Sequence, residues 1–531
     1  MFFQKLLVKI FFFIFLINGL WNVKNYGISY DELDYRQHGF VVLNYIGENL
    51  FPEKTKKIIK NRALEYPKIN DFTGAGINNY KIQHTLNAVL EYIFFKNKKK
   101  REQYIARHYI NFIFAFLSLI IFYKTLRIKF SRLYSLMGIT LFISNPRIVA
   151  EINYNPNDVW MMYFVIFYLY GVINYFKTLK KKYLIIISIA VALAINVRII
   201  GIYLYPLFLM TYFLKYGTKC KLNFKDNFFI YKNLILQFFF FLIFLFTITP
   251  QLWYDPMGIF KVFLGSLTFE HIDFKIWFES KYIFISQLPF YYLTAWILIS
   301  TPLIIILFLI LGFFFLSKKL IRISDIEKNL DIVLVFLAFA IPFAAAHILK
   351  PHIFNGWRHF YFLYPSIIYI ALYGFKCIFS AISKKKIQIC ILLILFINIS
   401  NLFLWSIKNH PYQYVYLNHL SKKYAYNYEL DYWGLSNTDA IRNIIENKNG
   451  ERVNIAGIGT TRINFSYFML TAEEQRHVRI VKLDSGEKID YYITNFQDGN
   501  FLEYYLKNNY EVVNYILVDD IIINATLKKI Y

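Results

Sequence analysis

Long apolar runs separated by short lysine-rich clusters place the strongest constraint on what this chain can fold into. Hydrophobic residues make up 57% of the 531 residues, and they gather in stretches that carry few charges. About 20 such residues in a helix span the hydrocarbon core of a bilayer. The sequence therefore predicts a polytopic α-helical membrane protein, and it excludes a string of soluble domains or a disordered chain. We expect about 11 spans, near residues 6–23, 104–123, 133–150, 157–176, 183–199, 199–214, 228–249, 288–316, 331–349, 359–376 and 387–407.

The basic residues predict how the spans are oriented. Lys and Arg number 59 against 34 Asp and Glu, which gives a formal net charge of +25. Because cytoplasmic loops of membrane proteins are enriched in Lys and Arg, the basic connections and the N-terminus are expected in the cytoplasm. The excess charge is thus a signal of topology, and no nucleic-acid partner is needed to explain it. The clusters occupy every second connection, at residues 124–132, 177–182, 215–225, 318–328 and 376–386.

The opposite, extracytoplasmic face receives a long loop and the C-terminal tail. The tail is mixed in composition and holds short alternating runs, which are typical of strands. We therefore expect two domains, a transmembrane domain at 1–407 and a small extracytoplasmic α/β domain at 408–531. The first extracytoplasmic loop, 24–103, belongs to the former. No small-residue cleavage site follows the first apolar run, so we expect an uncleaved span.

Carboxylates stand at two places on the predicted outer face. Asp31 and Glu32 follow the first span within a few residues. A carboxylate there can accept a proton from a hydroxyl group, although acidic residues in an aqueous loop are also ordinary solvated charges. Asp158 opens the fourth span, just after Pro156, which ends any helix that continues from the third. An acidic or amide residue at that point either caps the helix or serves the site, and the two roles are compatible.

Arg198 lies where the fifth span emerges from the membrane. A charge at the centre of a span costs about 2.5–3.5 kcal/mol, so such an arginine pairs with a partner or faces a cavity. At the interface it extends its head group to water, and no function is required. The uncertain end of the span leaves both interpretations open.

The densest polar cluster lies between the ninth and tenth spans and contains Trp357, Arg358 and His359. Arginine binds phosphate through two hydrogen bonds and keeps its charge, and an aromatic face supports a sugar or a lipid. The alternative is an aromatic belt with cations that reach the interface. The histidines at 347, 352 and 359 lack the spacing of a zinc site, so no metal site is predicted. Gly457-Ile458-Gly459 completes neither a dinucleotide fingerprint nor a P-loop, so no nucleotide cofactor is predicted.

Short motifs occur along the chain at Tyr30-Asp31-Glu32, the turn from Asn145 to Asp158, Asn196 to Gly201, Leu288 to Tyr292, Asn355 to Phe360, His410-Pro411-Tyr412 and Asp431 to Gly434. Taken together and in order, these motifs resemble those of glycosyltransferases of the GT-C fold. The resemblance is to bacterial family 39-like enzymes, which are related to protein O-mannosyltransferases and to the lipid A aminoarabinose transferase. Each motif is short, so the specificity lies in the set, which covers nearly the whole chain.

The resemblance implies a membrane glycosyltransferase (hexosyl- or pentosyltransferase) in the bacterial inner membrane. Such an enzyme moves a sugar from a polyprenyl-phosphate donor to an acceptor hydroxyl of a glycan, lipid or protein on the extracytoplasmic face. The transfer is an inverting single displacement, and it uses no cofactor. By the same resemblance Asp31 is the catalytic base, and Glu32 and Asp158 support it. The residues expected to bind the donor phosphate are Arg198, Arg358 and His359. Those expected to line the sugar or lipid path are Trp357, Trp253 and Tyr254.

A membrane transporter or flippase for a lipid-linked or polar substrate is the rival interpretation. It predicts two related halves and charges near the bilayer midplane. In this sequence the polar groups gather at one face and no repeated halves are visible, which favours the transferase. The residues alone do not decide whether Asp31 or Glu32 points into the site.

Overall fold

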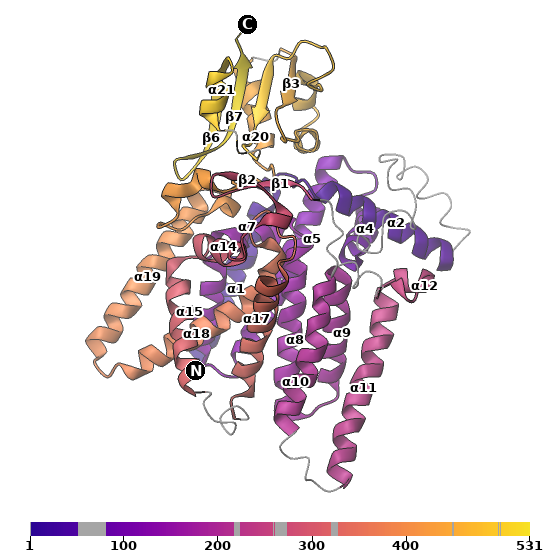
Figure 1. Ribbon diagram of the computed structural model, residues 1–531, viewed down its shortest axis with the longest axis vertical. Helices are drawn as coiled ribbons and strands as arrows, with labels where there is room; N and C mark the ends of the chain where they lie inside the picture. Colours follow the sequence, from indigo (N-terminus) through magenta and orange to yellow (C-terminus); the bar gives the residue numbers. More distant parts are fainter. Residues whose placement is uncertain are drawn as a thin grey trace.

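The computed structural model shows a helix bundle that carries a small sheet domain at one end (Figure 1). The C-terminus lies at the far tip of that domain, and the N-terminus lies toward the other end of the bundle. The side chains of residues 224–230 and of Tyr254 are not described. The structure describes residues 2–50, 81–216, 224–258, 260, 273–319, 328–448, 451–497, 499 and 501–530.

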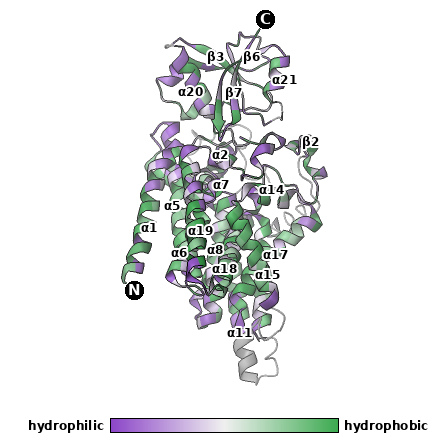
Figure 2. Ribbon diagram, turned by 90° about the vertical axis from the view of Figure 1, so that its left-hand side faces the viewer, coloured by the Kyte–Doolittle hydropathy of each residue, from purple (hydrophilic) through white to green (hydrophobic). Residues whose placement is uncertain are grey.

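Eight helices in the described part are long and apolar enough to cross a membrane. Figure 2 shows hydrophobic residues along most of the bundle and a mixture of hydrophobic and hydrophilic ones in the sheet domain. The predicted polytopic helical fold is thus confirmed. The eight are α1 (Phe2–Asn22) with η1 (Val23–Asn25), α5 (Lys100–Leu126), α8 (Asp158–Thr178), η5 (Ile199–Tyr203) with α10 (Leu204–Tyr216), α11 (Phe224–Ile248), α17 (Leu330–Leu349), η8 (Arg358–Leu363) with α18 (Tyr364–Ala381), and α19 (Lys385–Lys408).

The other three apolar segments are helical too, but none forms one helix of spanning length. The third is broken into α6 (Arg132–Ile143) and α7 (Pro146–Tyr154), which meet at 74°. Pro146 lacks the N–H that would continue α6, and it is suited to the first position of a new helix. The fifth, α9 (Lys182–Val197), has only 16 residues. The eighth is divided into α14 (Tyr292–Ser300) and α15 (Leu303–Lys319), with Pro302 between them.

Two further helices lie at the end of the bundle that carries the sheet domain (Figure 1). They are α2 (Glu32–Leu50) and α4 (Ile82–Phe94), and they pack against each other. A buried ion cluster joins them to α5, because Glu91 lies 2.6 Å from Arg36 and 2.7 Å from Arg107. This cluster fixes the first loop to the bundle.

The chain after α19 first packs on the helices and then forms the sheet domain. Tyr432 and Trp433 belong to the same hydrophobic core as the membrane helices. The domain that follows holds a five-stranded sheet in the order β4-β3-β5-β7-β6, in which β3 pairs in parallel with β4 and β5, and β7 runs antiparallel to β5 and β6. Its elements are α20 (Asn437–Asn447), β3 (Val453–Gly457), β4 (Val478–Ile480), β5 (Tyr491–Thr494), α21 (Leu502–Lys507), β6 (Tyr510–Val518) and β7 (Ile521–Lys529).

Short elements complete the described fold. The hairpin of β1 (Lys275–Phe278) and β2 (Lys281–Phe284) lies between the bundle and the sheet domain (Figure 1). The remaining short helices are α12 (Gln251–Tyr254), η7 (Ile285–Gln287), η9 (Gln413–Val415), η10 (Lys422–Asn427), η11 (Ser466–Met469) and η12 (Glu474–His477).

Candidate active site

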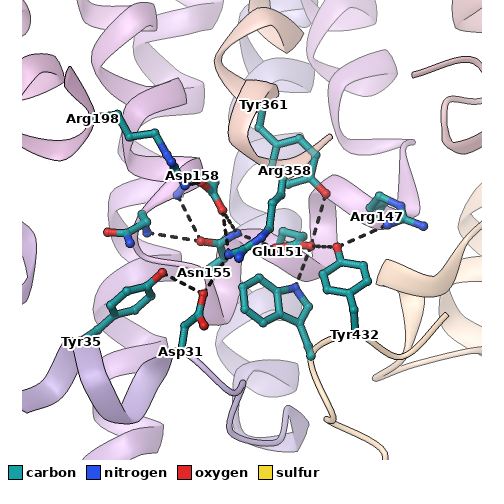
Figure 3. Close-up of polar contacts among 12 residues, drawn as sticks. Asp31, Tyr35, Arg147, Glu151, Asn155, Asp158, Arg198, Arg358, Tyr361 and Tyr432 are labelled. Carbon is teal, nitrogen blue, oxygen red and sulfur yellow. Dashed lines mark hydrogen bonds and ion pairs between the residues drawn. The ribbon is translucent and has the colours of Figure 1, made fainter. Parts of the chain in front are cut away.

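Charged side chains from four separate parts of the chain meet where the bundle joins the sheet domain. Figure 3 shows Asp31, Asp158, Arg198 and Arg358 pointing toward one another. They come from the start of α2, the start of α8, the junction of α9 with η5, and the start of η8. Each stands at or beside a helix end.

Asp158 is the buried centre of this cluster. Its carboxylate forms an ion pair with Arg198, lies 3.4 Å from Nη1 of Arg358, and accepts a hydrogen bond of 2.9 Å from Nδ2 of Asn155. Asn155 also takes the place of a cap, because its Oδ1 accepts from the backbone N–H groups of Asn157 and Asp158. Arg198 therefore pairs with a partner, which settles the choice that its position in the sequence left open.

Asp31 is the accessible carboxylate of the cluster. Its Oδ2 accepts hydrogen bonds from Nη1 of Arg358 at 2.9 Å and from the hydroxyl of Tyr35 at 3.0 Å. About a third of its side chain is exposed (32%), whereas Arg358 is buried (3%) with its guanidinium 4.5 Å from the centroid of the Trp433 ring. Arg358 thus lies between the two carboxylates and holds Asp31 at the open side.

Glu32 points away from the cluster. Its Oε2 accepts a hydrogen bond of 2.7 Å from the backbone N–H of Ser29, and its Oε1 lies 2.7 Å from Nε2 of His108. The side chain is buried, and it ties the start of α2 to α5. Of the two adjacent carboxylates, only Asp31 faces the cluster.

Lys81 joins the cluster although its position in the sequence does not single it out. It stands directly before α4, and its pKa is lowered to about 7, because burial and the charge of Arg198 disfavour the protonated form. The nearby charges of Asp158 and Asp31 act in the opposite direction. The first loop contains several other lysines, so residue type gives no signal that separates this one.

Glu151 is a second residue that the sequence did not reveal. From α7 it accepts hydrogen bonds from the hydroxyl of Tyr432 at 2.6 Å, Nε1 of Trp433 at 2.9 Å and the hydroxyl of Tyr361 at 3.3 Å. Asn155 donates a further bond of 2.8 Å through the same Nδ2 that holds Asp158. Glu151 thus fixes Asn155, and through it the buried carboxylate of the cluster (Figure 3).

The remaining residues predicted for the site occupy different surroundings. His359 follows Arg358, and its ring contacts that of Phe354 with the centroids 4.7 Å apart. Trp357 has no exposed surface and donates to Oγ of Ser300 at 2.8 Å, so it packs in the core behind the cluster instead of lining an open path. Trp253 lies in α12, at the end of α11, and donates to the carbonyl of Phe246.

The structure does not bring Trp253 to the charged cluster. Trp253 makes no described contact with it, and the side chain of Tyr254 lies outside the described part. Among the residues that the structure describes, no group of three or more His, Cys, Asp and Glu side chains could hold a metal ion.

The comparisons with known proteins concern the fold. No protein-family model matches the sequence, and no curated protein matches it either. The structure is similar to ArnT from Cupriavidus metallidurans in the apo state, with a TM-score of 0.49, 11% identity and 98% of each chain covered. It is also similar to the same protein bound to undecaprenyl phosphate, with a TM-score of 0.48, 10% identity and 98% of each chain covered.

A third similar structure is the archaeal oligosaccharyltransferase AglB from Archaeoglobus fulgidus, in complex with an inhibitory peptide and a dolichol-phosphate. Its TM-score is 0.44 at 11% identity, over 91% of this chain and 67% of that one. These neighbours have the GT-C fold, the class that the sequence motifs resemble. Because the identities are near 11% and the TM-scores are below 0.5, we base the function on the geometry of the site.

Proposed function

We propose that this multi-pass membrane protein is a glycosyltransferase that moves a sugar from a polyprenyl-phosphate donor to an acceptor hydroxyl. The observation that carries the proposal is Asp31, a partly exposed carboxylate held beside a buried arginine at the end of an apolar bundle. A carboxylate in that position can take a proton from a hydroxyl group. The helices of the bundle expose apolar side chains, against which a lipid tail can lie.

The charges around Asp31 suit a phosphate ester as the second substrate. The cations are Arg198, Arg358 and, when protonated, Lys81, and the anions are Asp31 and Asp158. Counting only these five, 3 − 2 leaves one positive charge, which the phosphate of a donor would balance. Guanidinium groups bind phosphate through charge-assisted hydrogen bonds, and the side chain of Arg198 is 22% exposed and so within reach.

In the proposed reaction the acceptor oxygen attacks the anomeric carbon of the donor sugar. The new carbon–oxygen bond forms as the bond between that carbon and the phosphate oxygen breaks, with inversion at the carbon. The electron pair of the broken bond leaves with the lipid phosphate, where the cations stabilise the added charge. The hydroxyl proton passes to Asp31.

Transfer by the purified protein tests this function. The protein, in lipid nanodiscs, is incubated with a panel of radiolabelled polyprenyl-phosphate hexoses and pentoses and with cell-envelope glycans, lipids or proteins as acceptors. We expect label in an acceptor and release of the lipid phosphate in equal amount. A folded protein that neither transfers label from any donor nor is stabilised thermally by one contradicts the proposal, and movement of an intact donor between the leaflets of sealed vesicles that contain the protein supports the flippase.

The pH dependence of donor binding tests the role of Lys81. With a pKa lowered to about 7, Lys81 is charged at pH 6 and mostly neutral at pH 8. The KM for the donor is therefore expected to be flat at acidic pH and to rise above about pH 7. Lys81→Met should raise the KM about tenfold at pH 6, since one charge-assisted hydrogen bond is lost, and should remove this rise. Lys98→Met, an exposed lysine after α4, should leave the profile as it is; a retained rise in Lys81→Met would contradict the role.

Orientation is a further part of the proposal, because the positive-inside rule puts the site and the sheet domain outside the cytoplasm. Single cysteines are placed at Ser485 in the sheet domain and at Lys181 between α8 and α9, in a chain whose three natural cysteines are replaced by serine. Both positions are exposed. In intact cells a membrane-impermeant thiol reagent is expected to label Ser485→Cys and not Lys181→Cys. Labelling of Lys181→Cys alone would show that the protein has the opposite orientation in the membrane.

A further inference from the structure

The residue directly before Asp31 is held by the sheet domain. The hydroxyl oxygen of Tyr30 accepts hydrogen bonds from Nδ2 of Asn495 at 3.0 Å, the backbone N–H of Arg462 at 3.1 Å and Nδ2 of Asn437 at 3.2 Å. These donors come from the end of β5, the loop after β3 and the start of α20. Three separate parts of the sheet domain thus converge on one phenol.

The segment that joins the bundle to the sheet domain also contacts Tyr30. The backbone N–H of Tyr30 donates to the carbonyl of Trp433 at 3.2 Å, and Asn495 also donates to the carbonyl of Asp431 at 2.7 Å. Gly434 has a φ of 69°, and a Cβ there would overlap the ring of Tyr30. Only glycine therefore fits both the backbone conformation and the contact.

The same segment reaches the buried side of the site. Trp433 donates to Glu151, and its ring lies against the guanidinium of Arg358. Asp431 accepts from the backbone N–H of Leu435 at 3.1 Å and of Ser436 at 3.2 Å, which holds the segment in its turn. The motif from Asp431 to Gly434 therefore contacts Glu151 and Arg358, which hold the carboxylates of the site. The sheet domain in turn contacts this motif.

We infer that the sheet domain positions the base, with Tyr30 as the positioning residue that fixes Asp31 toward the acceptor. This inference rests on the proposed role of Asp31 in sugar transfer. Asp31 is a third exposed, and its carboxylate is held by only two hydrogen bonds in the described part, so the direction it faces depends on the backbone that Tyr30 anchors. A small misplacement of a reacting group lowers the rate by up to about 10²-fold.

The first test replaces Tyr30 by phenylalanine, which keeps the ring and removes the hydroxyl group that accepts three hydrogen bonds. For Tyr30→Phe we expect kcat to fall about 10- to 100-fold while the KM for the donor changes less than about twofold, because the cations that bind the donor phosphate are untouched. Tyr505→Phe, which removes another buried hydroxyl of the sheet domain, should leave both constants unchanged. An unchanged kcat in Tyr30→Phe would overturn the inference.

The second test needs no activity. In hydrogen exchange, the amides at the start of α2 should lose protection by about tenfold or more in Tyr30→Phe and in Asn495→Ala, with α8 unaffected. Because the contact between Tyr30 and Asn495 is lost in both variants, the double variant should lose less protection than the sum of the two single losses. Unchanged exchange, or additive losses, would reject the coupling. A wild type that transfers no sugar would refute the proposed function alone, since this measurement still decides the coupling.

Discussion

Replacing Asp31 by asparagine is expected to lower the turnover of sugar transfer by about 10²- to 10⁴-fold, the usual contribution of a general base. The amide keeps the size of the side chain and can still accept a hydrogen bond from Arg358, but it cannot take the hydroxyl proton. The fold and the KM for the donor should therefore change little. The measurement is the initial rate at saturating donor and acceptor, with thermal stability recorded on the same preparation.

Asp34→Asn is the matched control for this variant. Asp34 lies three residues further along the start of α2, and its carboxylate makes no hydrogen bond or ion pair to the described residues. Partial desolvation and the charge of Asp31 raise the pKa of Asp34, so it is a carboxyl group of the same neighbourhood without the contact to Arg358. We expect the rate of Asp34→Asn to stay within about threefold of wild type, a change far smaller than the loss of a general base causes. Equal rates for Asp31→Asn and wild type would show that the base lies elsewhere.

Replacing Asp158 by asparagine is expected to affect stability most. The side chain of Asp158 has no exposed surface, and its carboxylate faces both Arg198 and Arg358. Removing one partner of a buried ion pair leaves uncompensated charge in a medium of low dielectric constant, which costs about 3–5 kcal/mol of unfolding free energy. Denaturant unfolding in detergent, followed by tryptophan fluorescence, measures the loss.

Asp520→Asn provides the comparison, because it removes the same charge from an exposed ion pair. Asp520 lies 3.3 Å from Lys422, and 85% of its side chain is exposed. Exposed pairs contribute about 0–1 kcal/mol. Should Asp158→Asn lose no more stability than Asp520→Asn, the carboxylate of Asp158 is not the electrostatic centre that the structure indicates.

Much of the architecture was predictable from the chain because membrane insertion is governed by local composition. Every apolar run that was expected to span forms helix, and the short alternating runs that predicted strands in the tail form β3, β5, β6 and β7. The breaks were less visible. Pro146 and Pro302 interrupt apolar segments without interrupting their hydropathy, and β4 is only three residues long. Hydropathy averages over a window and therefore does not register a single missing N–H.

For the site, the sequence indicated which residue types gather on one face, and it named Asp31, Asp158, Arg198 and Arg358 as members. It did not choose between Asp31 and Glu32. Neighbours at a helix start point to different sides, and only the packing of α2 on α5 shows which side is the site.

The sequence by itself determined the membrane-spanning class, the position of the apolar helices and the polar face on which a site can exist. Those features follow from runs of similar residues, whose transfer into lipid depends on composition alone. The tertiary structure decided the pairing of Arg358 with Asp31, 327 residues apart, the recruitment of Lys81 and Glu151, and the hold of the sheet domain on Tyr30. Contacts of this kind depend on single atoms brought together from distant segments, and a pattern along the chain carries no record of them.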